Sequence, residues 1–279
     1  MAKGGIAFLG GGIMAEAMIR AVLDRHVFTP SQVAVTGPRR ERRAELAKRF
    51  RVTALASNAE AAKGAEVVVL SVKPQVLPAV MKELHGQLRA EQLVISIVAG
   101  APMKALEAGL AHPAIVRSMP NTPAQVGMGV TAWYPSPAVT EAQRERTKGI
   151  LAALGEELMV EDESYLDMAT ALSGTGPTYV FLLMEALVDA GVHLGFSRRV
   201  AEELVLRTVE GSALFARKSG RHLAELRNMV TSPGGTSAAA IYQLEKGSLR
   251  TVLSKAVYAA YQRSSELGAA AERKVTKTE

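Results

Sequence analysis

Short, strongly apolar runs recur through the first half of the chain, and they restrict its fold more than any other feature. They cover residues 6–9, 33–36, 67–72, 93–98 and, more weakly, 114–116. Many of their residues are β-branched, and the runs are bounded by glycine and proline, as in strands that are buried on both faces. Segments with helical spacing of apolar residues separate them. Such alternation predicts a parallel sheet with helices on both sides.

The pattern changes near residue 162. From there to residue 267 the sequence contains no convincing strand, and helical patterns broken by glycine and proline follow, at residues 165–172, 177–191, 198–217 and 249–267. We therefore expect two domains, an α/β domain over residues 1–162 and an all-α domain over residues 163–279. A chain of 279 residues is long enough for two domains.

A glycine-rich segment, GGGIMA at residues 10–15, joins the first apolar run to a helical pattern. It has the form G-x-G-x-x-A, in which Gly10 allows a tight turn and Gly12 lets a pyrophosphate approach the backbone. Ala15 is small enough for close packing of helix on strand. The motif has little specificity alone, but its place after the first strand predicts a Rossmann-type doubly wound domain that binds a dinucleotide.

The end of the second apolar run indicates which dinucleotide is bound. No acidic residue lies between Asp24 and Glu41, although domains that select NADH place one there for the ribose 2′-hydroxyl. The segment instead contains Thr36, Arg39 and Arg40, and a hydroxyl with two guanidinium groups suits the 2′-phosphate of NADPH. NADH remains an alternative. A solvated helix face is the competing interpretation, and we adopt it for four neighbouring bases: Arg42, Arg43, Lys48 and Arg49.

Composition excludes several classes of function. The chain has no cysteine, which rules out disulfides, thiolate metal sites and cysteine nucleophiles, and no His/Asp/Glu cluster has the spacing of a metal site. The net charge is +6, but residues 39–51 alone carry +5, so a broad nucleic-acid-binding face is not expected. We see neither a secretory leader nor an uncharged apolar stretch near the length of a membrane span. A cytoplasmic protein is therefore expected.

Five further segments occur in a characteristic order. They are VKPQ at 72–75, VAG at 98–100, MPNTP at 119–123, LSGTGPTY at 172–179 and VTSPGGTS at 230–237. Together they resemble the pyrroline-5-carboxylate reductase family over residues 6–267, with TSPGGT the most specific motif. Thr175 stands where the family commonly has serine and Ser237 where it commonly has threonine, so a hydroxyl is kept at both positions.

The resemblance implies NAD(P)H-dependent reduction of 1-pyrroline-5-carboxylate to L-proline. It also implies that the helical domain binds substrate and forms dimers, which assemble into decamers in many members. The predicted cofactor-binding residues are Gly10, Gly12, Ile13, Met14, Ala15, Thr36, Arg39, Arg40, Asn58, Val72, Lys73, Pro74, Ala99, Gly100 and Asn121. The predicted substrate-binding residues are Ser232, Gly234, Gly235, Thr236, Ser237, Ser173, Gly174 and Thr175.

The chemistry of the imine agrees with these residues. A protonated imine is already electrophilic, so positioning of the two reactants supplies most of the catalysis, and none of the five histidines lies in a glycine-rich motif. The loop at 231–237 precedes an expected helix, whose N-terminus would hold the substrate carboxylate. We assign catalytic roles to Ser237, which would hydrogen-bond the ring nitrogen, and to Thr236. The alternative is that these hydroxyls only cap the helix. The segment 173–177 is expected to form a tight turn that walls the pocket.

Two other functions remain open at this stage. A β-hydroxyacid dehydrogenase has a similar layout, but its mechanism needs a lysine in the second half, and no lysine occurs between Lys148 and Lys218. A non-catalytic dinucleotide-binding module would need only the first domain. The sequence also leaves open whether the apolar stripe of the last helix is buried within the chain or against a partner.

Overall fold

The computed structural model describes residues 4–275. Contacts divide the chain into two compact units, which we call the sheet unit (Met1–Thr175 and Ala260–Glu279) and the helical unit (Gly176–Ala259). The last helix therefore contributes to both. The predicted functional boundary at residue 162 stays a prediction, since it concerns the roles of the two parts rather than their contacts.

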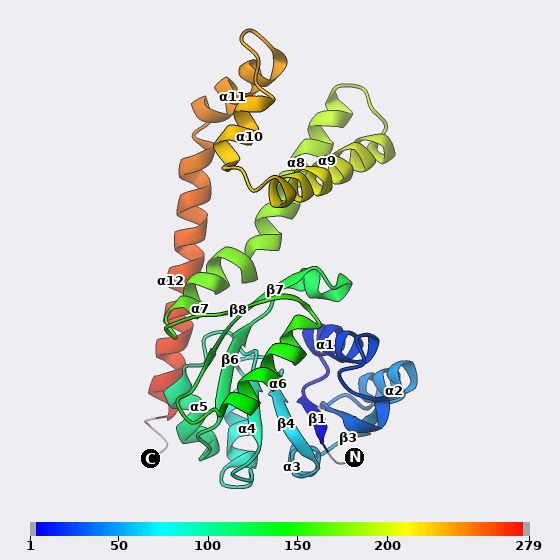
Figure 1. Cartoon of the computed structure of the whole chain (residues 1–279), viewed down its shortest axis with the longest axis vertical. Coiled ribbons are helices and arrows are strands. Elements are labelled where there is room, and N and C mark those ends of the chain that lie inside the picture. Colours follow the sequence, from blue (N-terminus) through cyan, green and yellow to red (C-terminus); the bar gives the residue numbers. More distant parts are fainter. Residues whose placement is uncertain (1–3, 276–279) are drawn as a thin grey trace. The chain divides into compact units, whose positions relative to one another are not determined.

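The sheet unit contains one eight-stranded sheet with the order β3-β2-β1-β4-β5-β6-β7-β8 (Figure 1). All neighbouring strands are parallel except β6 and β7. The strand order reverses at β1, because β2 and β3 lie on one side of it and β4 and β5 on the other. Such a switch point opens a crevice at the carboxyl ends of the strands. The strands are β1 (Gly5–Leu9), β2 (Val33–Thr36), β3 (Thr53–Leu55), β4 (Ala65–Leu70), β5 (Leu93–Ser96), β6 (Ile115–Met119), β7 (Gly129–Pro135) and β8 (Gly155–Met159).

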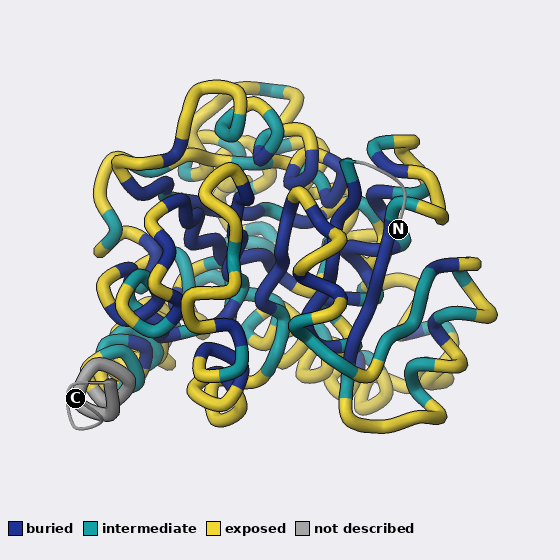
Figure 2. The backbone as a smooth tube through the Cα atoms, turned by 90° about the horizontal axis from the view of Figure 1, so that it is seen from below, coloured by how far each residue is buried: buried dark blue, intermediate teal, exposed yellow. Residues whose placement is uncertain are grey.

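Helices cover both faces of this sheet, so the predicted doubly wound α/β class is confirmed. Alternate residues of β1 point to opposite sides, with Ile6 and Phe8 in one apolar core and Ala7 and Leu9 in the other. The first core is closed by α1 (Ile13–Asp24), α2 (Arg40–Phe50) and α6 (Glu141–Ala152); the second is closed by α3 (Asn58–Lys63), α4 (Leu77–Leu84) and α5 (Met103–Leu110). Figure 2 shows the buried strands between the exposed outer faces of the helices.

The prediction of a tight turn at residues 173–177 is wrong. The chain continues as helix through α7 (Tyr165–Ala169), a π-helical segment, η3 (Thr170–Gly174), and α8 (Gly176–His193). Pro177 has no N–H for the carbonyl of Ser173, and the wide π turn just before it accommodates this defect. By length and composition, the joined stretch Tyr165–His193 would be able to cross a membrane, which is weak evidence by itself.

The helical unit confirms the all-α prediction for this part of the chain. It holds α8, α9 (Arg198–Ser219), α10 (Leu223–Met229), α11 (Thr236–Lys246) and the first part of α12 (Leu249–Val275). The sequence patterns predicted the long helices but not α10. Among the hydrophobic side chains of this unit only Val188 and Ala201 are buried. A set of helices with so small a core needs additional packing to be stable.

Candidate functional site

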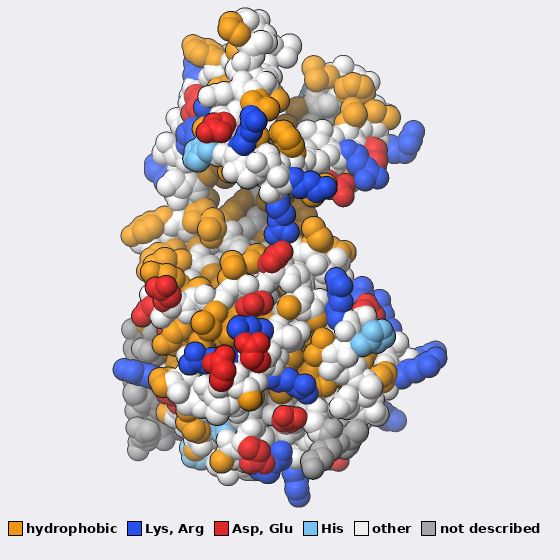
Figure 3. Space-filling view, viewed as in Figure 1, with side chains coloured by type: hydrophobic (Ala, Val, Ile, Leu, Met, Phe, Trp, Pro, Cys, Tyr) orange, Lys and Arg blue, Asp and Glu red, His pale blue; other side chains and the backbone are white. Residues whose placement is uncertain are grey.

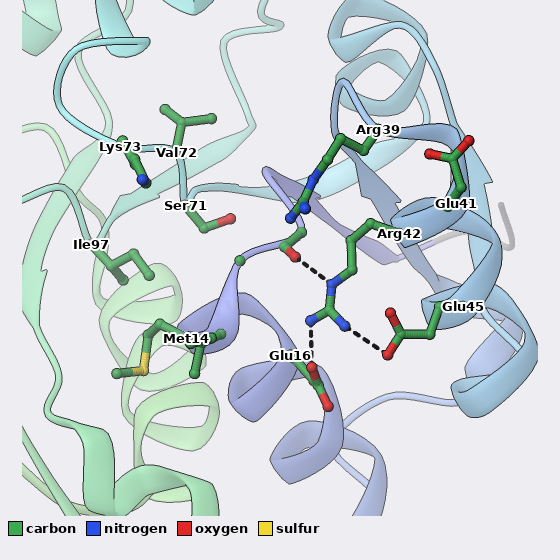
Figure 4. Close-up of a pocket in the computed structure, with 13 residues that line it drawn as sticks. Met14, Glu16, Arg39, Glu41, Arg42, Glu45, Ser71, Val72, Lys73 and Ile97 are labelled. Carbon is green, nitrogen blue, oxygen red and sulfur yellow. Dashed lines mark hydrogen bonds and ion pairs between the residues drawn. The ribbon is translucent and has the colours of Figure 1, made fainter.

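A cleft of about 800 Å³ opens in the sheet unit at the switch point beside β1 (Figure 4). Its walls come from the glycine-rich loop after β1, the first turn of α1, the start of α2 and the segments after β4 and β5. The lining residues are Gly11, Gly12, Ile13, Met14, Glu16, Arg39, Glu41, Arg42, Glu45, Ser71, Val72, Lys73 and Ile97.

The glycines of the loop have the geometry that the motif predicts. Gly10 has φ +113°, and a Cβ there would lie 2.6 Å from the carbonyl oxygen of Ser71. A side chain at Gly12, in contrast, would meet nothing within 4 Å, so a bound group can approach this stretch of backbone. Gly10 is therefore required by packing and backbone conformation, while Gly12 keeps the cleft open.

The N-terminus of α1 faces this opening. Gly12 is its N-cap and makes no side-chain cap, and among the described residues no side chain accepts a hydrogen bond from the first turn. The N–H groups of such a turn have no partner inside the helix, so Ile13, Met14 and Ala15 offer donors and a positive dipole to an anion. Ala15 is fully buried, as its packing role predicts, whereas Ile13 is 67% exposed at the cleft.

Arg42 was interpreted as part of a solvated face, and that is wrong. Its Nε donates to the carbonyl oxygen of Gly11 at 3.0 Å, and its two terminal nitrogens form ion pairs with Glu16 and, at 2.8 Å, with Glu45. Arg42 thus ties α2 to the glycine-rich loop and to the first turn of α1 (Figure 4). Arg49 is also committed, through an ion pair with Glu16 at 2.5 Å. No local pattern indicates these contacts, because Glu16 lies far from α2 along the chain.

These arginines change the acidity of Glu16. Desolvation raises the pKa of its carboxyl, but the hydrogen bond and charge of Arg42, together with the charges of Arg49 and Arg20, outweigh desolvation and hold the pKa below its ordinary value. Glu16 is therefore ionised at neutral pH. Its negative charge lies in the turn where a pyrophosphate would bind, and Arg42 offsets it there.

Replacing Arg42 with methionine keeps the apolar stem and removes the three polar contacts. We expect Kd for NADPH and for NADH to rise together, by about fivefold to tenfold, because the loop that both cofactors share loses its anchor. The free energy of unfolding should fall by about 1–2 kcal/mol at pH 7. Since the pKa of Glu16 is depressed in the folded protein, this stability difference should shrink as pH falls below about 4.5. Titration calorimetry and urea unfolding at two pH values test this; a loss confined to NADPH would contradict it.

The predicted phosphate-binding residues at the end of β2 have different fates. Arg39 lines the cleft beside Arg42, and it makes no hydrogen bond or ion pair with the described residues (Figure 4). It is the N-cap of α2, whose first turn also lacks a side-chain cap. Arg40 is exposed but does not line the cleft. Thr36 is fully buried and donates its hydroxyl hydrogen to Asn58 Oδ1 at 2.6 Å, so this hydroxyl is already used within the protein. Arg39 and Arg40 remain the predicted phosphate-binding residues.

The remaining predicted cofactor residues lie around the carboxyl edge of the sheet. Val72 and Lys73 line the cleft, and exposed Pro74 follows them. Sequence reasoning missed Ser71, which donates to the carbonyls of Leu9 and Gly10 at 3.1 and 2.9 Å and so holds the glycine-rich loop against β4. It also missed Ile97, which lines the cleft just after β5.

Three further predicted cofactor residues also lie outside the cleft lining. Gly100 packs against α12, where a Cβ would lie 2.9 Å from Leu267 Cβ, and Ala99 precedes it. Asn121 is buried and accepts a hydrogen bond from the Val130 N–H at 2.9 Å. Their roles in cofactor binding stay predictions.

The predicted substrate loop lies in the helical unit. Gly234 has φ +71°, which favours glycine, and the Gly235 N–H donates to the Ser232 carbonyl at 3.0 Å to close a turn. Gly235 is the N-cap of α11, and no side chain caps the helix. Thr236 and Ser237 therefore occupy the first two helical positions. The alternative in which they serve only as caps is not supported, and the first turn keeps its N–H groups for an anion.

The other predicted substrate segment belongs to the sheet unit and bonds to its own backbone. Ser173 donates to the Ala169 carbonyl and Thr175 to the Thr170 carbonyl, both at 2.9 Å. Gly174 allows the helix to pass Met119, whose sulfur would lie 3.4 Å from a Cβ at that position. The substrate-binding roles of these three residues stay predictions.

Comparisons with known proteins cover both units. A family model described as NADP oxidoreductase, coenzyme F420-dependent, matches residues 5–100, and one described as pyrroline-5-carboxylate reductase dimerisation matches residues 163–267. The chain is 44% identical to the pyrroline-5-carboxylate reductase of Pseudomonas aeruginosa over 94% of its own length and 96% of that protein. It is 37% identical to the Arabidopsis thaliana enzyme of the same name, over 94% of this chain and 95% of that one.

Solved structures agree with the sequence matches. The Plasmodium falciparum pyrroline carboxylate reductase with NADP bound superposes with a TM-score of 0.88 at 32% identity, covering 96% of this chain and 99% of that one. The Coxiella burnetii pyrroline-5-carboxylate reductase gives 0.86 at 36% identity, covering 95% and 98%. These relatives, the glycine-rich cleft and the uncapped helix of the second unit lead to one conclusion: the chain belongs to the pyrroline-5-carboxylate reductase family of oxidoreductases.

Proposed function

We propose that this protein reduces 1-pyrroline-5-carboxylate to L-proline with NADPH as the electron donor. The observation that carries the proposal is the pair of uncapped helix N-termini, α1 behind Gly12 and α11 behind Gly235. Each presents unpaired N–H groups to an anion, and the reaction needs two anionic reactants to be held. The first suits a pyrophosphate and the second a small carboxylate.

NADPH fits the first cleft. Gly12 leaves open space beside the backbone, and Arg39 offers an uncommitted guanidinium at the end of β2, where the adenosine ribose lies in doubly wound domains. The relative from Plasmodium falciparum has NADP bound, which supports the same cofactor here. A bound nicotinamide would supply the hydride.

The helical unit would hold the substrate. The first turn of α11 binds the ring carboxylate, and the Ser237 hydroxyl hydrogen-bonds the ring nitrogen. One hydride adds to the carbon of the protonated C=N bond, whose electron pair moves to nitrogen, so NADPH, one proton and the imine give NADP⁺ and proline. Thr236 and Ser237 orient the ring for this transfer, and orientation of this kind is worth about 7–11 kcal/mol.

Replacing Ser237 with alanine tests this assignment. We expect kcat to fall about tenfold to a hundredfold, because the ring nitrogen loses the hydrogen bond that orients it, and a misplacement of about 1 Å can cost about a hundredfold. Kd for NADPH should stay within about twofold of wild type, since loss of a neutral hydroxyl outside the cofactor cleft removes no cofactor contact. Steady-state kinetics and NADPH titration measure the two quantities. Unchanged kcat would reduce Ser237 to a structural residue of α11.

We also propose a cytoplasmic homodimer that assembles into a decamer. Hydrophobic side chains are exposed on the surface of the helical unit (Figure 3). Phe181 is 61% and Leu204 51% exposed in the single chain. The family model for dimerisation covers this part of the chain, and burial against a second copy would supply the missing core. The same burial accounts for the apolar character of residues 165–193 without a membrane. Light scattering after size exclusion would measure the assembly.

The activity test adds the imine to protein and NADPH and follows absorbance at the nicotinamide band. Imine-dependent NADPH oxidation with proline as product is expected. NADPH binding without turnover would identify a dinucleotide-binding module instead, and oxidation of small hydroxy acids by NADP⁺ would identify a β-hydroxyacid dehydrogenase.

A further inference from the structure

A partly buried hydrogen-bond chain joins α4, α3 and the end of β2, and its outer member was not predicted from the sequence. Glu83, on α4, accepts hydrogen bonds from the backbone N–H groups of Asn58 and Ala59 at 2.9 and 3.2 Å. Its other carboxylate oxygen accepts from Asn58 Nδ2 at 2.7 Å. Asn58 Oδ1 then accepts from the buried Thr36 hydroxyl at 2.6 Å. The chain therefore runs from α4 through the start of α3 to the end of β2.

The carboxylate fixes the direction of every bond in this chain. An ionised carboxylate can only accept, so the Asn58 amide must turn its nitrogen toward Glu83 and its oxygen toward Thr36. The Thr36 hydroxyl must consequently donate to Asn58. A neutral amide at position 83 would instead present a donor to Asn58, because the N–H groups of Asn58 and Ala59 would hold its oxygen.

These residues lie where the adenosine half of a dinucleotide binds. Thr36 ends β2 next to β1, and its carbonyl oxygen would lie 3.6 Å from a Cβ on Gly11 of the glycine-rich loop. Asn58 is half-buried just after β3, the neighbour of β2. In doubly wound domains the carboxyl end of the second strand faces the adenosine ribose.

We propose that Glu83 is a positioning residue for the adenosine half of the cofactor: it fixes the orientation of the Asn58 amide and so sets the donor and acceptor pattern beside the ribose. The proposal rests on dinucleotide binding by this cleft. Glu83 is not a catalytic residue, because it acts only through Asn58 and the first turn of α3.

The test variant is Glu83→Gln. Glutamine keeps one oxygen for the backbone N–H groups of α3 but turns an NH₂ group toward Asn58, which must reverse its amide to avoid two facing donors. We expect Kd for NADPH and for the fragment 2′,5′-ADP to rise by the same factor, about fivefold to tenfold. We expect kcat at saturating NADPH to stay unchanged, and the Asn58 side-chain NH₂ resonances to shift in a ¹⁵N spectrum.

Glu60→Gln is the matched control. Glu60 lies on the same first turn of α3, is exposed, and its carboxylate bonds to none of the described residues. This variant removes the same charge from the same helix end without touching Asn58. Equal losses of affinity in the two variants would overturn the proposal, as would a shifted Asn58 resonance with unchanged NADPH affinity, or a loss for NADPH without one for 2′,5′-ADP.

An exchange variant covers the case in which Glu83→Gln folds poorly. The double variant Glu83→Gln with Asn58→Asp has the same total charge as the wild type. One oxygen of the new aspartate can accept from the Thr36 hydroxyl, and the other can accept from the NH₂ group of the new glutamine. Recovery of both thermal stability and affinity for NADH relative to Glu83→Gln supports the proposal, because NADH has no 2′-phosphate for the new carboxylate to repel. Failure of either to recover overturns it. A wild-type protein that bound no NADPH would instead refute the proposed function.

Discussion

Replacing Gly10 with alanine should abolish useful cofactor binding. The backbone at Gly10 has φ +113°, and the new Cβ would lie 2.6 Å from Ser71 O and 3.0 Å from Val72 Cγ1. The loop must therefore move away from β4, which displaces the N–H groups that face the pyrophosphate. A displacement of about 1 Å at such a site can cost about a hundredfold. We expect Kd for NADPH and NADH to rise at least that far, with about 2–4 kcal/mol lost in the free energy of unfolding.

Gly149→Ala is the control for this change. Gly149 lies within α6, where an added Cβ meets nothing within 4 Å, so the protein should keep its affinity and gain up to about 1 kcal/mol of stability. Calorimetric titration and denaturant unfolding measure both quantities. A Gly10→Ala protein with wild-type affinity would show that the loop is not held in the observed conformation when the cofactor binds.

Replacing Arg39 with alanine should weaken NADPH binding selectively. Arg39 lines the cleft and has no partner among the described residues, so it is available to a 2′-phosphate. Loss of charge-assisted hydrogen bonds worth about 1.5–3 kcal/mol corresponds to about a tenfold to hundredfold rise in Kd for NADPH. NADH lacks that phosphate, and its Kd should stay within about twofold.

Lys48→Ala controls for the loss of charge from α2, because Lys48 is exposed and outside the cleft lining. Lys48→Ala should change neither the Kd for NADPH nor the Kd for NADH. Arg40→Ala measures whether the second predicted arginine takes part, although it lies outside the lining. Equal losses for both cofactors in Arg39→Ala would refute the assignment of Arg39 to the 2′-phosphate.

The sequence predicted those parts of the structure that depend on local pattern. The buried runs became β1, β2, β4, β5 and β6, and GGGIMA became the turn into α1. The roles of Gly10 and Gly12 were predictable because each depends on local backbone: Gly10 needs its positive φ, and Gly12 needs open space beside it. The helical second half followed from its period and from the absence of buried strand patterns.

Contacts between distant segments could not be predicted in the same way. The pairing of Arg42 with Gly11 and Glu16 depends on how α2 packs beside α1, and nothing in the arginine-rich pattern distinguishes it from exposed bases such as Lys48. Likewise Glu83 meets Asn58 only because α4 lies next to α3. The continuous helix through Gly174 was missed because glycine and proline usually mark turns, whereas here a π-helical turn accommodates them.

A crystal structure with NADP⁺ and proline bound together tests the central claim most directly. The account predicts the pyrophosphate on the first turn of α1 and the proline carboxylate on the first turn of α11. It also predicts the nicotinamide C4 about 3–3.5 Å from the proline ring carbon that received the hydride. A proline carboxylate bound away from α11, with its ring out of reach of the nicotinamide, would contradict it.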